Sequence, residues 1–388
     1  MKYNWTKKKL SEIAYINPRE SIGKGVVAKK VPMDKLQPFC RDVPEFVLEE
    51  YKGGTKFRNG DTIMARITPC LENGKIAKVS VLSDDEVGFG STEYIVFRAI
   101  DGVSDADFLY YLICSPLVRN PAIKSMVGSS GRQRVQTDVV VNLDIELPPI
   151  EEQRKIGGLL KAIDDKIELN NKINNNLEQQ AKALYKDWFF DFTPFSTVGN
   201  LPDGWRLGTV SDIIQFHDSK RVPLSGAERD KMAKIYPYYG ATSLMDYVDN
   251  YLFDGIYLLL GEDGTVVDSL GFPILQYVYG QFWVNNHAHI ITGKEGFSVE
   301  ELYLFFSLTN IKSIVTGAVQ QKVSQQNLKK VPAIIPSKDA LSAFDELIQP
   351  IFSQIRNLRD ENASLADLRD TLLPKLISGE LDVSDIDL

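Results

Sequence analysis

The sequence from Leu147 to Asp191 decides how this chain is organised, and it reads LPPIEEQRKIGGLLKAIDDKIELNNKINNNLEQQAKALYKDWFFD. A pair of prolines ends the preceding element, and a pair of glutamates follows where a helix N-terminus favours acidic side chains. Apolar or amide side chains then recur at alternating steps of four and three, from Ile156 to Trp188. This periodicity predicts one helix, roughly 60 Å long at about 1.5 Å per residue, that packs against another helix along its length.

The second helix of the pair is expected in the same chain, because the same rhythm returns from Leu341 to Leu376. A shift of 188 positions superposes the two patterns and brings Asn174 onto Asn362. An asparagine in such a seam costs stability but fixes the register, so we expect the helices to face each other in one defined alignment. The alternative is an ordinary long core helix whose polar seam positions are solvated. The predicted seam residues are Ile156, Leu160, Ile163, Ile167, Asn174, Leu177 and Leu184, with Ile348, Ile351, Ile355, Leu358, Asn362, Leu365 and Leu372.

Three residues are expected to disturb these helices. Gly157 and Gly158 weaken the first turns of the first helix, which predicts fraying or bending there. Pro350 lies inside the second pattern and is expected to kink that helix or to mark its effective start.

The chain also carries an internal duplication. Residues 5–13 (WTKKKLSEI) match residues 205–213 (WRLGTVSDI) at an offset of 200, whereas the later matches have an offset of 188. Each half is a region of about 150 residues followed by one long helix. Similar ends and different middles are what two modules with one architecture and different targets would show.

The region before each helix has the composition of a mixed α+β fold. In the first half, residues 61–65, 75–81 and 94–98 predict strands, and residues 107–114 predict a helix followed by another that reaches about residue 126. In the second half, residues 256–260 and 287–291 predict strands and residues 298–308 a helix. Residues 192–203, rich in turn-forming residues, predict the linker.

Charge and cysteine usage narrow the class of protein. The net charge is −8, but residues 1–150 hold 21 basic against 19 acidic residues, while residues 341–388 hold 4 against 10. A nucleic acid responds to local basic surface within a Debye length of about 8–10 Å, so the whole-chain charge does not exclude DNA. The three cysteines are widely spaced, which favours a reducing, cytoplasmic location, and we expect neither a signal peptide nor a membrane span.

Motifs for catalysis are missing from the sequence. It lacks a complete phosphate-binding loop, a dinucleotide fingerprint and an Asn/Asp-Pro-Pro-aromatic methyltransferase loop. His287 and His289 lie on one face of a predicted strand, but with three histidines and no cysteine pair we interpret them as structural residues rather than metal ligands. We therefore expect no catalytic residue, no bound cofactor and no metal site in this chain.

Loops in both halves instead carry side chains suited to DNA. Residues 128–134 read GSSGRQR, and residues 317–322 of the second half occupy the matching place. Arginine can bind guanine O6 and N7, glutamine can bind adenine, and both can hold phosphates. The expected DNA contacts are Lys24, Lys29, Lys30, Arg66, Thr68, Lys75, Ser91, Thr92, Ser129, Ser130, Arg132, Gln133 and Arg134, with Lys220, Arg221, Tyr238, Tyr239, Thr242, Gln320, Gln321, Lys322, Gln325 and Gln326.

These features together resemble the specificity subunits of Type I restriction–modification systems. The resemblance is carried by LPPIEEQRKIG at 147–157, KDWFFDF at 186–192, LPDGWRLGTVSDI at 201–213 and RDTLLPKLISGE at 369–380. It extends over essentially the whole chain. The second half lacks the GSTE motif and the arginine-rich loop of the first, so its loop residues are assigned less directly.

The resemblance implies two target-recognition domains held by an antiparallel pair of helices. The implied boundaries are residues 1–147 and 192–336 for the domains, 148–191 and 337–380 for the helices, and 381–388 for an acidic tail. It further implies a bipartite double-stranded DNA target, two methylase subunits and two restriction–translocase subunits, with S-adenosylmethionine, ATP and Mg²⁺ bound by those partners. The alternatives are a recognition subunit of another methylase or nuclease system, a divergent DNA nuclease, and a coiled-coil assembly factor without a DNA role.

Overall fold

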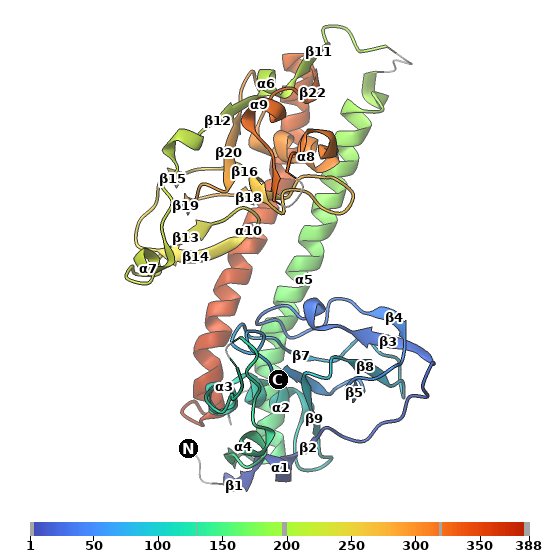
Figure 1. The fold of residues 1–388 in the computed structure, drawn as a ribbon, viewed down its shortest axis with the longest axis vertical. Helices are drawn as coiled ribbons and strands as arrows, with labels where there is room; N and C mark the ends of the chain where they lie inside the picture. Colours follow the sequence, from blue (N-terminus) through green and yellow to red (C-terminus); the bar gives the residue numbers. More distant parts are fainter. Residues whose placement is uncertain (1–3, 130, 196–199, 318–319, 384–388) are drawn as a thin grey trace. The chain divides into compact units, whose positions relative to one another are not determined.

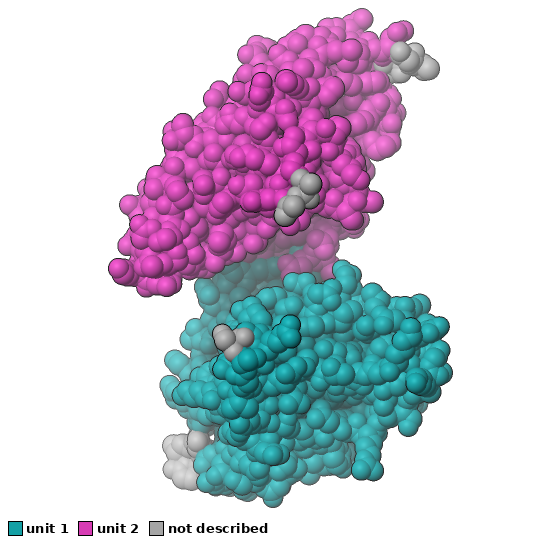
Figure 2. Space-filling view, viewed as in Figure 1, with its two compact units in different colours: residues 1–170, 360–388 teal, residues 171–359 magenta. Residues whose placement is uncertain are grey.

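The computed structural model describes residues 4–129, 131–195, 200–317 and 320–383. The chain divides into two compact units, unit 1 with residues 1–170 and 360–388 and unit 2 with residues 171–359 (Figure 2). Each unit contains a mixed module of sheets and short helices together with part of each of two long helices (Figure 1). The expected α+β fold with an internal duplication and two long helices is therefore confirmed.

The long helices are α5, Ile150–Phe189, and α10, Lys338–Ile377, and each has 40 residues. Helix α5 is continuous through Gly157, so the expected fraying is wrong. A Cβ at Gly157 would lie 2.7 Å from the backbone nitrogen of Phe108, so the glycine lets another part of unit 1 approach the helix closely. Helix α10 continues through the exposed Pro350 and does not start there.

Within unit 1 the two helices run antiparallel, because the residue numbers of the contacting positions on α10 decrease as those on α5 increase. Asp164 pairs with Arg369 at 2.8 Å, and one to two turns later the Asn170 amide donates to Asn362 Oδ1 at 2.9 Å. The superposition of Asn174 on Asn362 reflects the duplication of the sequence. The fully buried Asn170 hydrogen-bonds to Asn362, because an antiparallel pair joins positions of constant sum rather than of constant offset.

Within unit 2 aromatic packing joins the same two helices. Phe344 of α10 lies against Tyr185, Trp188 and Phe189 of α5, with ring centroids 4.8–5.6 Å apart. These rings belong to a cluster that also buries residues of the unit 2 module, so this face of α5 contacts a module as well as α10.

The predicted seam residues differ in how completely they are covered. Those buried are Ile156, Leu160, Ile163, Ile348, Ile355 and Leu358, and those half-buried are Ile167, Asn174, Leu177, Leu184, Ile351, Asn362, Leu365 and Leu372.

The module of unit 1 is built on two four-stranded sheets. The first has the antiparallel order β2-β9-β6-β7, and the second has the order β4-β3-β8-β5, in which β3 and β8 are parallel. Strands β1 and β10 pair separately, close to the start of α5. The bounds are β1 Thr6–Lys9, β2 Ala14–Ile16, β3 Val27–Val31, β4 Val47–Glu50, β5 Lys56–Phe57, β6 Thr62–Ala65, β7 Ile76–Lys78, β8 Gly88–Gly90, β9 Tyr94–Ala99 and β10 Asp144–Leu147, with helices α1 Leu10–Ile13, α2 Ala106–Cys114, α3 Pro116–Lys124 and α4 Thr137–Val141.

The module of unit 2 repeats this topology. Its sheets have the orders β12-β20-β16-β18 and β14-β13-β19-β15, again with one parallel pair, and β11 pairs with β22 as β1 does with β10. It adds the short pair β17-β21 and helix α7. The bounds are β11 Arg206–Thr209, β12 Ile214–Phe216, β13 Tyr236–Tyr239, β14 Leu244–Val248, β15 Phe253–Asp254, β16 Tyr257–Gly261, β17 Asp263–Gly264, β18 Leu275–Val278, β19 Gln281–Val284, β20 Ala288–Gly293, β21 Gln321–Lys322 and β22 Pro332–Ile335, with helices α6 Val210–Ile213, α7 Gly226–Arg229, α8 Val299–Leu308 and α9 Gln325–Leu328.

Polar anchors attach each module to the long helices. In unit 1 the buried Arg41 pairs with Asp165 of α5 at 2.7 Å, and Tyr111 donates to Asp164 at 2.6 Å. In unit 2 Arg356 of α10 pairs with Glu300 at 3.0 Å. Removing one partner of a buried pair leaves an unpaired charge and typically costs about 3–5 kcal/mol, which applies to Glu300, whose side chain is 4% exposed. Among the described helices, neither of the long ones nor any other is apolar enough over a sufficient length to cross a membrane.

Candidate nucleic-acid interface

Three loops of unit 1 meet at one edge of the first sheet, where strand β6 ends and strand β9 begins. They are residues 66–75 after β6, residues 91–93 before β9, and residues 127–129 and 131–135 between α3 and α4. The backbone amide of Arg66 donates to the Glu93 carbonyl at 2.9 Å, and that of Val135 donates to the Arg66 carbonyl at 2.9 Å. Residues 127 and 134 also form a β-bridge, which closes the third loop on itself. We call this main-chain arrangement the loop frame.

Arg134 and Glu93 form the ion pair of this frame. Arg134 Nε lies 2.9 and 3.0 Å from the two Glu93 carboxylate oxygens, and Nη2 lies 2.6 Å from Oε1. The hydrogen bonds from Arg134 hold the pKa of Glu93 below its usual range despite partial burial, with the nearby charge of Arg66 acting in the same direction. The Arg134 side chain is 48% exposed, so it remains accessible to a ligand.

Other predicted contacts in these loops hold the loops together. Arg66 Nη2 donates to the Val135 carbonyl at 3.3 Å, Thr68 donates to Glu72 at 3.1 Å, and Lys75 donates to the Met33 carbonyl at 2.9 Å. The Ser91 hydroxyl accepts the backbone amide of Glu93 at 3.1 Å. These side chains organise the surface from which their neighbours project.

Unit 2 builds the same loop frame with different side chains. The backbone amide of Glu262 donates to the His287 carbonyl, and that of Val323 donates to the Glu262 carbonyl, both at 2.8 Å. The β-bridge between Thr316 and Lys322 repeats the one that closes the loop in unit 1. Glu262 therefore occupies the place of Arg66, His287 that of Glu93, and Lys322 that of Arg134.

The side chains of the second frame make their own pairs. Glu262 accepts Arg221 Nη1 at 2.7 Å and lies 3.5 Å from Lys322 Nζ. His287 Nδ1 lies 2.6 Å from Asp263 Oδ1, and the imidazole is 46% exposed. Neither Glu262 nor Asp263 was predicted from the sequence as a site residue, because their neighbours lie far away along the chain.

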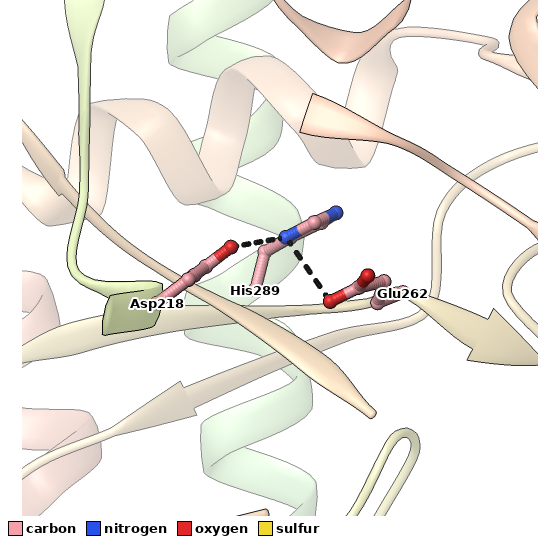
Figure 3. A group of neighbouring side chains, drawn as sticks. All are labelled: Asp218, Glu262 and His289. Carbon is pink, nitrogen blue, oxygen red and sulfur yellow. Dashed lines mark hydrogen bonds and ion pairs between the residues drawn. The ribbon is translucent and has the colours of Figure 1, made fainter. Parts of the chain in front are cut away.

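A compact acidic and histidine group lies beside this frame. Asp218, Glu262 and His289 bring one ligand atom each within 4.8 Å of one another, as a metal site would require (Figure 3). However, His289 is buried, and both of its ring nitrogens face acceptors, Asp218 Oδ2 at 2.7 Å and the Val323 carbonyl at 2.8 Å. Both ring nitrogens of His289 therefore have hydrogen-bonding partners inside unit 2, and the group forms an internal hydrogen-bond network.

Asp218 shows what this network does. Burial opposes its ionisation, but the hydrogen bond from His289 and the charge of that ring outweigh burial, and the pKa of Asp218 lies below its usual range. Asp218 Oδ1 accepts a hydrogen bond from the backbone amide of Ile290 at 2.9 Å, and Asp218 Oδ2 accepts one from the Gln325 side chain. The network therefore connects β20 to the segment around Asp218 and to the start of α9.

The remaining predicted DNA contacts divide by exposure. Those exposed are Lys24, Thr92, Ser129, Arg132, Lys220, Thr242, Gln320 and Gln326, and those half-buried are Gln133, Gln321 and Tyr239. Lys29 pairs with Glu86 and Lys30 with Glu49, each at 2.9 Å. Ser130 lies outside the described residues.

The prediction that Tyr238 contacts DNA is wrong. It is 1% exposed, and its hydroxyl accepts the Leu224 amide at 3.0 Å inside unit 2. Its neighbours on β13, Pro237 and Tyr239, are half-buried, because successive side chains of a strand point to opposite faces of the sheet. Its side chain belongs to the core and is not available to DNA.

Comparison with known proteins agrees with this architecture. Residues 2–179 and 202–366 each match the model of the Type I restriction modification DNA specificity domain. The chain is 28% identical over 314 residues to the Type I restriction enzyme MjaIX specificity subunit of Methanocaldococcus jannaschii, covering 74% of this chain and 71% of that one. It is 24% identical over 403 residues to the HindI specificity subunit of Haemophilus influenzae, covering 84% and 87%.

A solved structure shares the fold. The crystal structure of the Type I restriction–modification S subunit from M. genitalium aligns over 96% of both chains with a TM-score of 0.51 and 16% sequence identity. The two modules and two long helices thus define a duplicated recognition protein. The chain belongs to the Type I restriction–modification DNA specificity family.

Proposed function

We propose that each unit reads one half of a bipartite DNA target through its loop frame, and that α5 and α10 set the spacing between the half-sites. The observation that carries this proposal is the repeated frame with exchanged side chains. One main-chain scaffold presents Arg66, Glu93 and Arg134 in unit 1, whereas the other presents Glu262, His287 and Lys322. Equivalent positions with different hydrogen-bonding groups suit two different base sequences.

Exposed cations and amides in each unit support a DNA role. Arg132 and Lys24 in unit 1, and Lys220 and Gln320 in unit 2, project into solvent. Side chains of this kind bind phosphates, which position a protein on the duplex, while groups held in the frame read base edges. The negative net charge of the chain is no obstacle, because much of the acidity falls in residues 341–388.

We further propose that the chain contributes recognition and no chemistry. In this view it docks two methylase subunits, which bind S-adenosylmethionine, and two restriction subunits, which bind ATP and Mg²⁺. The internal pairing of Glu262 and Asp218 with Arg221 and His289 supports this, because a metal-dependent nuclease needs carboxylates that are free to hold its ion.

Sequencing the methylome of cells that express this chain with its methylase tests the proposal. The expected result is adenine methylation at one asymmetric motif with two defined parts separated by a fixed number of unspecified base pairs. A continuous motif, or methylation that is the same without this chain, would contradict it. Cells that express the methylase alone are the control.

A further inference from the structure

We propose that Arg134 reads a guanine in the half-site recognised by unit 1, and that Glu93 is the positioning residue that aims it. This inference rests on the proposed DNA-binding function and names one base and the pair of residues that selects it. The inference follows from the geometry of the Arg134 guanidinium, one edge of which is hydrogen-bonded to Glu93 while another has no such partner.

The geometry of the pair leaves one edge of the guanidinium free. Glu93 takes the side edge, through Nε and Nη2 of Arg134. In the described part of the chain no hydrogen bond reaches Nη1, and the side chain is 48% exposed, so the end edge formed by Nη1 and Nη2 is available to a ligand. Two parallel N–H groups on that edge match the O6 and N7 acceptors of guanine in the major groove.

The loop frame fixes Glu93 before DNA arrives. Its amide donates to Ser91 Oγ, its carbonyl accepts the Arg66 amide, and its side chain is 23% exposed. An arginine already held in one orientation loses less conformational entropy on binding, which favours a specific contact. Because Arg66 lies nearby, the three charges sum to +1 and the site still attracts a polyanion.

An ordinary surface ion pair is the competing interpretation, since exposed pairs contribute little to stability. The comparison of the two frames argues against it. Unit 2 has Lys322 at the place of Arg134, and lysine is a point charge without a two-pronged edge. The contact through the planar arginine fork therefore belongs to one half-site only, and its loss should leave the other half-site unchanged.

The test uses the complex with its methylase and compares methylomes of the wild-type chain, Glu93→Gln and Arg134→Lys. Both variants should relax the same guanine position in one half-site and keep the other half-site and the spacing. Glu45→Gln is the matched control, because it removes the carboxylate of an exposed pair with Lys35 elsewhere in unit 1 and should keep the wild-type motif. An unchanged motif in both variants, or relaxation at an A·T pair, would overturn the inference.

A binding measurement keeps the test decisive if a variant methylates too weakly to read. The DNA probe carries 7-deazaguanine at the position in question, which removes the N7 acceptor. The wild-type complex should bind it about fivefold or more weakly than natural DNA, whereas Arg134→Ala, which has no donor at this position, should show no such difference. An equal loss in both complexes would overturn the inference. Failure of the proposed function is distinguishable, because the wild-type complex would then give no bipartite motif.

Discussion

Individual residues in this protein have environments that a sequence pattern does not reveal, and Glu301 is the clearest case. It is fully buried in unit 2, where its carboxylate accepts the Ser298 amide at 2.8 Å and completes the capping box of α8. Burial raises its pKa to about 8, and the charges of Asp345 and Glu300 act in the same direction, against the hydrogen bonds from Ser298. The side chain satisfies the backbone but is costly to ionise.

This position predicts a pH-dependent stability. The pKa of Glu301 in the folded state lies above its ordinary value. The contribution of the protonated side chain to the free energy of unfolding is therefore complete below about pH 4.5 and is lost as pH rises through about 8. Glutamine keeps the capping acceptor without the charge. Between pH 6 and pH 9 the free energy of unfolding of the wild type should fall by about 2–3 kcal/mol relative to Glu301→Gln.

Urea unfolding at the two pH values measures the difference between these chains. Glu346→Gln changes an exposed glutamate of α10 and is the control, which should behave as the wild type does. Parallel pH dependence of the wild type and Glu301→Gln would show that this carboxylate is not the group responsible.

Arg132 has a different environment from Arg134, although the two residues are only two positions apart. It is exposed on the same loop and is not part of the Glu93 ion pair, so we expect it to bind a phosphate. Arg132→Ala should weaken binding to all DNA sequences alike and lower the slope of log affinity against log salt by about 1. Lys186→Ala, on α5, should leave the slope unchanged. Titrations of the complex between 50 and 200 mM salt measure both.

At the scale of elements, the helices α5 and α10 are the feature that sets the half-site spacing in our proposal. Both cross the boundary between the units, between Asn170 and Asn171 in α5 and between Arg359 and Asp360 in α10. Four residues inserted at both places add about 6 Å and a net rotation of about 40° without changing contacts inside either unit.

The motif of that variant should have a spacer longer by one or two base pairs, since DNA rises about 3.4 Å per base pair, and the half-sites themselves should not change. Insertion of two residues in each helix rotates the segments by about 200° and should abolish methylation. Methylome sequencing compares the variants. An active four-residue variant with the original spacer would show that the helices do not set the distance.

For the whole molecule, the family and the loop frames together predict a chain that recognises DNA but depends on partners for chemistry. The purified chain with S-adenosylmethionine and target DNA should transfer no methyl groups, whereas addition of the methylase should produce methylation of the bipartite site. Transfer of labelled methyl groups to DNA is the measurement. Robust methylation by the chain alone would contradict the proposed division of labour, and methylase alone on the same DNA is the control.

The sequence by itself determined the architecture of this protein. The rhythm from Ile156 to Trp188 and its repetition from Leu341 predicted both long helices, and the matches at residues 5–13 and 205–213 predicted the duplication. Such features can be read because helix periodicity and internal repeats are local or involve direct comparison of two segments. The missing catalytic motifs and the arginine-rich loop suggested a recognition function for the same reason.

Only the tertiary structure decided which side chains meet. Asn362 accepts a hydrogen bond from Asn170, whereas the sequence repeat matches Asn362 with Asn174, since antiparallel helices reverse one numbering against the other. Glu93 reaches Arg134 across 41 residues, and Glu262 takes the place of Arg66, because strand pairing and loop closure bring together segments that no local pattern connects. Tyr238 faces the core for a related reason, the alternation of side chains along a strand whose two faces the sequence did not distinguish.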